Sequence, residues 1–141
     1  ETPNNRPEGI TTDDTNIWIA DSTDPNVFKH DIAGVFIDSF SLTAQNRDST
    51  GMTTDGVNIW IVDQKDAAVY KYDMAGTYVD SFNLTAANAD ATGITTDGTN
   101  FWVVDVTDAA VYKYDMSGAY DTTFNLSSAN ADPQGVTMIP R

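Results

Sequence analysis

A period of 42 residues runs through the chain and constrains its fold more than any other feature. Gly9 recurs as Gly51, Gly93 and Gly135. Tryptophan, aspartate and phenylalanine keep the same step, at Trp18, Trp60 and Trp102, at Asp21, Asp63 and Asp105, and at Phe40, Phe82 and Phe124. Three near-identical copies of one unit therefore make up the chain, and a fourth copy begins at its C-terminal end.

Turn signals divide each copy into four short strands. In the second copy, the strands are predicted at residues 52–54, 59–62, 69–72 and 78–82. The stretch 59–62 is apolar at every position, which is typical of a strand that is buried on both faces. Gly56 lies in the turn before it and can supply the positive φ of a tight turn. No stretch of the repeat keeps a helical period.

Four strands in a repeat of this length are typical of a β-propeller blade. We therefore predict an all-β fold of three four-stranded antiparallel blades and one repeat domain spanning residues 1–141. The blades are expected at residues 9–50, 51–92 and 93–134, and residues 135–141 are expected to add an extra first strand.

The third copy carries a recognisable pattern in the run Gly93–Asp105, followed by residues 110–115 and Gly118. This pattern resembles the NHL-type propeller repeat, and the resemblance extends over all three copies. It implies a propeller, a fold that serves as binding platform, receptor ectodomain or enzyme. The copies depart from the family at 67–68 and 109–110, where alanines replace the usual charged loop residue. In this they are closer to repeat arrays of secreted bacterial proteins.

Three blades do not close a ring, because propellers have four to eight. The open blade faces would expose apolar patches of a size that monomers rarely tolerate, so we expect the chain to associate. Two chains could form a six-bladed ring, the chain could form a polymer, or it could be an excised part of a longer propeller. The residues expected to pair outside their own three blades, in a neighbouring chain or segment, are Gly135, Val136, Thr137, Met138 and Ile139. They would compete there with the N-terminal strand, residues 9–12.

The formal net charge is −14, which makes nucleic acid a poor partner because phosphate binding needs a basic surface. A soluble surface rich in turn-forming aspartates, a salty medium and cation binding all remain as explanations of the acidity. The chain has no cysteine and no apolar run long enough to span a membrane. It begins with Glu1 rather than Met, which is expected of a processed or excised chain. The expected location is the cell exterior or surface.

Repetition argues against catalysis, because enzymes need unlike groups that converge on one point. His30 is the only histidine, and tyrosine replaces it in the other copies. The leading hypothesis is a non-enzymatic extracellular module for binding or self-assembly, without a cofactor and with a protein or glycan ligand. The alternative is a hydrolase or lactonase with a metal in the propeller channel. Against it, such sites use a glutamate among unlike ligands, and only Glu1 and Glu8 are present.

Three further sets of residues have both a structural and a functional interpretation. The repeated aspartates at strand ends are expected to hold turns, with Ca²⁺ ligation as the alternative. The tryptophans are expected to fill the core between blades rather than to bind sugars. Asn83 and Asn125 each begin an N-glycosylation motif, at equivalent positions of two copies.

Overall fold

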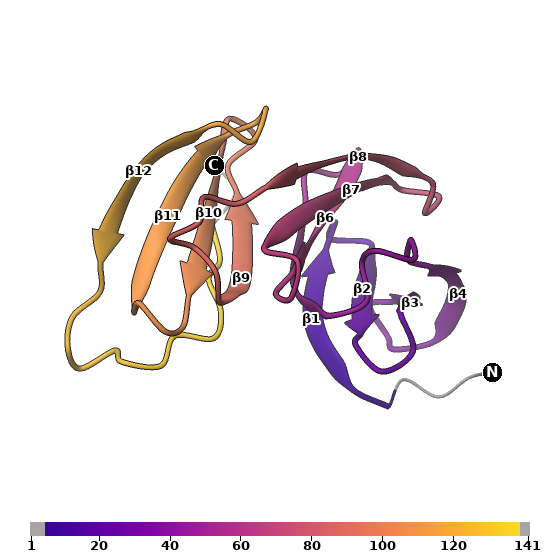
Figure 1. Ribbon diagram of the computed structural model, residues 1–141. Helices are drawn as coiled ribbons and strands as arrows, with labels where there is room; N and C mark the ends of the chain where they lie inside the picture. The colour runs from indigo at the N-terminus through magenta and orange to yellow at the C-terminus, as the bar shows by residue number, and fades with distance from the viewer. Residues whose placement is uncertain (1–4, 139–141) are drawn as a thin grey trace.

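The computed structural model describes residues 5–138, which form three four-stranded antiparallel sheets and no helix (Figure 1). Blade 1 holds β1 (Pro7–Thr12), β2 (Asn16–Asp21), β3 (Asn26–Asp31) and β4 (Phe36–Ser41). Blade 2 holds β5 (Ser49–Thr54), β6 (Asn58–Asp63), β7 (Ala68–Asp73) and β8 (Tyr78–Asn83). Blade 3 holds β9 (Ala91–Thr96), β10 (Asn100–Asp105), β11 (Ala110–Asp115) and β12 (Tyr120–Asn125). The predicted all-β propeller fold is confirmed.

The second strand of the middle blade is buried on both faces, as its apolar sequence predicted. Ile59 and Ile61 of β6 lie in the core between blades 1 and 2. Trp60 and Val62 point the other way, into the core between blades 2 and 3. Successive side chains of a strand alternate between its two faces, so a blade with neighbours on both sides needs apolar residues at every position.

The innermost strands of the three blades pack side by side around one axis (Figure 1). The recurring glycine permits this close approach. A Cβ atom at Gly51 would lie 2.8 Å from the Cα atom of Gly93, and one at Gly93 would lie 3.0 Å from the Cα atom of Gly135. Any larger residue would push neighbouring blades apart at the axis, which explains why every copy keeps this glycine.

The buried aspartate at the end of each second strand holds two chain segments together. One carboxylate oxygen of Asp63 accepts the backbone N–H of Asp66 at 2.9 Å. The other accepts the backbone N–H groups of Arg47 and Asp48, at 2.8 Å and 2.9 Å. Equivalent bonds occur at Asp21 and Asp105. These carboxylates therefore act in the turns of the blade, as the structural interpretation predicted.

Candidate functional site

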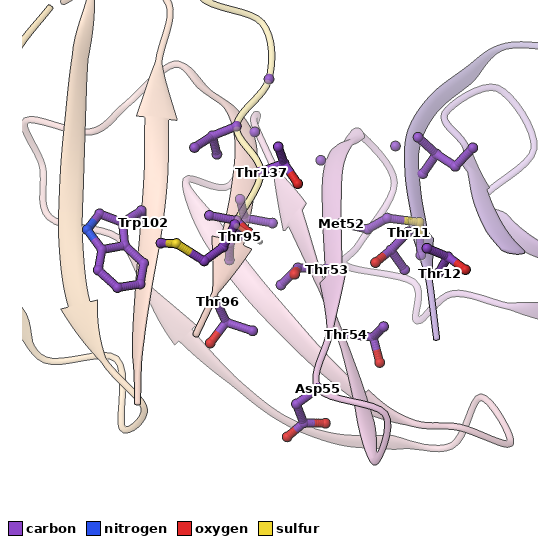
Figure 2. Close-up of a pocket in the computed structure, with 18 of the residues that line it drawn as sticks. Thr11, Thr12, Met52, Thr53, Thr54, Asp55, Thr95, Thr96, Trp102 and Thr137 are labelled. Carbon is purple, nitrogen blue, oxygen red and sulfur yellow. The ribbon is translucent and has the colours of Figure 1, made fainter. Parts of the chain in front are cut away.

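An open groove of about 1460 Å³ follows the inner strands β1, β5 and β9, where a closed propeller has its channel. The segment 134–138 forms the remaining wall. One threonine from each inner strand, and one from this segment, line the groove at equivalent positions (Figure 2): Thr11, Thr53, Thr95 and Thr137. The repeat thus gathers hydroxyl groups along the axis.

The aspartates of the first turns, Asp13, Asp55 and Asp97, also line this groove. One oxygen of Asp97 accepts the backbone N–H groups of Asn100 and Thr99, each at 2.8 Å. These hydrogen bonds lower the pKa of Asp97 below its ordinary value, because they stabilise the carboxylate form. The rim of the groove is therefore acidic at neutral pH, and each aspartate is already engaged in its turn.

Within residues 5–138, no group of three or more His, Cys, Asp or Glu side chains is arranged to hold a metal ion. His30 lies on β3 and does not line the groove. Ca²⁺ ligation by the aspartates stays a prediction. The same residues contain no helix that is long and apolar enough to cross a bilayer.

Two tryptophans are buried in the core, as predicted. Trp18 and Trp60 are 1% and 3% exposed, and each lies in the cluster between its own blade and the next. Trp102 is half-buried and lines the groove instead (Figure 2). Its exposure follows from its position on the side of blade 3 that no described blade covers.

The two outer blades each present one uncovered side. We call the uncovered side of blade 1 the leading face, defined by Ile10, Ile17, Ile19, His30 and Gly34. We call the uncovered side of blade 3 the trailing face, defined by Trp102, Phe124, Leu126 and Asn130.

The exposed fractions of equivalent residues show the effect of the missing neighbouring blade. Ile10 is 65% exposed, whereas its counterparts Met52 and Ile94 are 5% and 3% exposed. This position of the leading face is therefore buried at both boundaries inside the chain and open in blade 1.

A phenylalanine and a glycine meet at each boundary between blades. The ring of Phe40 in blade 1 packs on Gly76 in the β7–β8 turn, so closely that a Cβ atom at Gly76 would overlap it. Phe82 packs on Gly118 in the same way. Gly34, at the leading face, has nothing within 4 Å of its Cβ position, and Phe124, at the trailing face, is 52% exposed.

A tyrosine and an asparagine form the second repeated contact between blades. The Tyr72 hydroxyl accepts hydrogen bonds from the Asn46 side-chain amide at 3.1 Å and the Thr43 backbone N–H at 3.2 Å. Tyr114 and Asn88 repeat the side-chain bond at 3.1 Å. Both asparagines are fully buried, so this polar contact lies inside the boundary between blades.

At the leading face, His30 takes the place of this tyrosine. Its ring lies 5.8 Å from that of Phe36, and its Nδ1 atom is buried without a hydrogen-bond partner among the described residues. Asn130, the counterpart of the two buried asparagines, is exposed at the trailing face. The chain therefore has an asparagine at one end and, at the other end, a histidine in place of the tyrosine.

The C-terminal segment takes the inner position beside β9. The Thr92 hydroxyl donates to the Pro133 carbonyl at 3.1 Å, as Thr50 donates to the Ala91 carbonyl at 3.0 Å one blade earlier. Residues 135–138 are not assigned to a strand, and Ile139 lies outside the described residues. Pairing of this segment outside its own three blades stays a prediction.

Both candidate glycosylation sites are accessible. Asn83 and Asn125 are exposed at the C-terminal ends of the outer strands β8 and β12. Their modification stays a prediction.

The contacts between blades were not predicted from the sequence. Phe40 and Gly34 both recur with the 42-residue period, so the sequence marked each residue type as part of the repeat. The missing information was that a phenylalanine of one copy meets a glycine of the following copy, which only the arrangement of the blades shows.

Three antiparallel four-stranded blades around one axis define the class of β-propellers. Solved propeller structures from enzymes are similar. Virginiamycin B lyase from Staphylococcus aureus matches with a TM-score of 0.71 and 17% identity over 94% of this chain and 45% of its own. A streptogramin B lyase matches with a TM-score of 0.69 and 18% identity, over 93% of this chain and 44% of its own. Glutaminyl cyclase from Myxococcus xanthus matches with a TM-score of 0.77 and 10% identity, over 95% of this chain and 63% of its own.

These similarities show the fold, at 10–18% identity, and this chain spans less than two thirds of each of those proteins. No protein-family model matches the chain, and neither does the sequence of any curated protein.

The expectation that the chain is not an enzyme is corrected by these comparisons. The similar structures belong to two lyases and a cyclase, which are enzymes. The expectation was wrong because it rested chiefly on repetition of the blades. Enzymes share this blade architecture, so repetition gives no ground for excluding catalysis.

Proposed function

We propose that this chain is a ring-forming segment of an NHL-type β-propeller at the cell exterior, which docks further blades onto its leading and trailing faces. The observation that supports this most is the phenylalanine–glycine contact. It is made at both boundaries inside the chain and is left half-made at each end, at Gly34 and Phe124. The same contact is thus made twice inside the chain, and one glycine and one phenylalanine are left without their counterpart.

The physical reason for docking is the apolar character of both faces. Ile17 and Ile19 are half-buried at the leading face, whereas Ile59 and Ile61 are fully buried at the same positions of blade 2. Covering an apolar face releases about 25 cal/mol for each Å² removed from water. A further blade supplies the side chains that give this burial inside the chain.

Extending the chain by one blade tests the proposal. Residues 135–141 are replaced by a copy of residues 93–141, so that a fourth blade follows Gln134. We expect a higher free energy of unfolding, because Trp102 becomes buried like Trp60. The same extension with Phe124→Ala serves as the control, and its free energy of unfolding should rise by less. A fourth blade that unfolds separately, with no added stability in the first three, would contradict the proposal.

The axial groove supports a second candidate function, the binding of a small polar ligand such as a glycan. The supporting observation is the row of threonine hydroxyls at Thr11, Thr53, Thr95 and Thr137. Sugars would be screened by thermal shift, since a ligand that binds only the folded state raises Tm. Thr53→Val and Thr95→Val keep the side-chain shape and remove the hydroxyl. A ligand that binds the double variant as tightly as the original chain does not use this site.

A further inference from the structure

We infer that the partner of both open faces is a second copy of this chain, and that two copies close a six-bladed ring. This inference rests on the proposed docking function. The trailing face of each copy would meet the leading face of the other, and a two-fold axis along the channel relates the two identical contacts. The internal boundaries between blades supply the template for each contact.

The first contact is between Phe124 of one copy and Gly34 of the other. Phe40 on Gly76 and Phe82 on Gly118 show the arrangement twice inside the chain. Gly34 keeps the positive φ of those glycines, at 83° against 86° and 84°. The turn at the leading face is therefore already in the conformation that receives a phenylalanine ring.

The second contact is between His30 of one copy and Asn130 of the other. It replaces the bond that Asn46 makes with Tyr72 and that Asn88 makes with Tyr114. His30 stands at the position of these tyrosines, and Asn130 stands at the position of these asparagines. The side-chain amide of Asn130 can donate to or accept from the edge of an imidazole ring.

The apolar residues also match. Inside the chain, the ring of Trp60 lies 5.1 Å from that of Phe101, at a steep angle. The repeat places Trp102 at the position of Trp60, and Ile17 at the position of Phe101. The trailing tryptophan of one copy therefore meets the leading isoleucine of the other, and both are only half-buried in the single chain.

Ring closure requires the segment 135–138 to leave its place, because β1 of the second copy needs the same position beside β9. β1 is held to β2 by an antiparallel ladder that runs from Pro7 to Thr12. The segment 135–138 is not assigned to a strand. We therefore assign the position to β1, since moving the segment breaks no strand ladder.

Two cysteine variants test the inference, because the chain has no cysteine of its own. Phe124→Cys and His30→Cys are prepared separately and as a double variant, checked for folding by circular dichroism, and treated with a short bis-maleimide. We expect a covalent two-chain product from the mixed single variants and from the double variant. Each single variant alone should give none, because the contact joins unlike faces. In the double variant, the product should stop at two chains.

Mass measurement of the unmodified chain gives an independent readout. We expect a native species of twice the 15.3 kDa chain mass at micromolar concentration, and a dissociation constant raised about tenfold or more by Phe124→Ala. A ladder of larger products, or a chain that stays monomeric, would overturn the inference. A monomeric chain that still gains stability from an appended fourth blade would refute only the second copy as partner. No gain from the fourth blade would refute the docking function itself.

Discussion

The ring of Phe82 occupies the space directly above Gly118, where a side chain would otherwise extend from the β11–β12 turn. The two residues lie 36 positions apart and belong to different blades. The ring also lies 6.0 Å from that of Tyr114, which bonds to Asn88 of the preceding blade. One aromatic side chain thus joins the outer part of blade 2 to the turn and the third strand of blade 3.

Replacing this glycine should separate steric overlap from backbone strain. We expect Gly118→Ala to lower the free energy of unfolding by about 2–4 kcal/mol, because a methyl group overlaps Phe82 and position 118 has a positive φ. Gly34→Ala is the matched control, since Gly34 has the same φ and no neighbouring ring. Gly34→Ala should lower the free energy of unfolding of the monomer by only about 1 kcal/mol. Equal losses in denaturant titrations of the two variants would show that packing on Phe82 contributes nothing.

The first turn of copy 1 offers a stabilising change. Asp14 has a φ of 69°, whereas Gly56 and Gly98 occupy this position in the other copies, with φ of 84° and 82°. Asp14→Gly should raise the free energy of unfolding by up to about 1 kcal/mol, because glycine adopts this backbone region without strain. Gly56→Asp is the reverse change at the equivalent turn and should be destabilising. Thermal unfolding of both variants checks the pair, and a loss of stability in Asp14→Gly would contradict it.

Much of the fold could be predicted from the sequence because the repeat aligns the same local signals three times. The strand predicted at 59–62 is β6, and the apolar residues on both of its faces were the signal for a blade with two neighbours. The strand boundaries were predicted one to three residues too short, as at 52–54 against Ser49–Thr54. Polar residues such as Ser49 and Thr50 are buried at the start of β5 by packing of the inner strands, which local patterns do not report.

The open faces could be predicted only in part. Three blades imply two bare sides, but the sequence does not show which residues lie on them. Ile10 and Ile94 are nearly alike in the sequence, yet one is 65% exposed and the other 3%. The difference comes from the order of blades in space. A role for His30 between blades could not be predicted either, because only the structure places Asn46 and Asn88 beside its tyrosine counterparts.

Low pH should remove the stabilisation that the buried carboxylate of Asp21 gives to the folded chain. Burial acts to raise the pKa of Asp21, but backbone N–H donors of Arg6, Asp24 and Thr23 outweigh it, and the pKa is lower than in the unfolded chain. A lowered folded pKa means that the stabilisation is complete above the unfolded pKa of about 4 and is lost as pH falls through the folded pKa.

Asp21→Asn isolates this contribution. At pH 7 we expect a loss of about 1 kcal/mol, because charge-assisted hydrogen bonds become neutral ones. The difference from the original chain should shrink below pH of about 4. Asp38→Asn removes the same charge from an exposed position and controls for the overall acidity. Denaturant titrations at several pH values measure both variants, and a difference for Asp21→Asn that does not change with pH would contradict the assignment.

Removing residues 135–141 tests how the inner position of the closing blade is filled. If this segment pairs in a neighbouring chain, as the sequence predicts, its deletion should weaken association. Ring closure by β1 of a second copy requires the opposite result. The segment already lies beside β9 of its own chain, where Thr92 bonds to Pro133, and β1 of a second copy needs that position.

We therefore expect the chain that ends at Gln134 to associate more tightly than the full chain, by sedimentation velocity at equal concentrations. The free energy of unfolding of the monomer should fall slightly, because β9 loses the packing of Val136 and Met138 at its open side. Val136→Gly with Met138→Gly is the matched control, since it weakens the same packing while the chain keeps its length. Weaker association of the truncated chain would show instead that the segment pairs with β2 of the second copy and displaces β1.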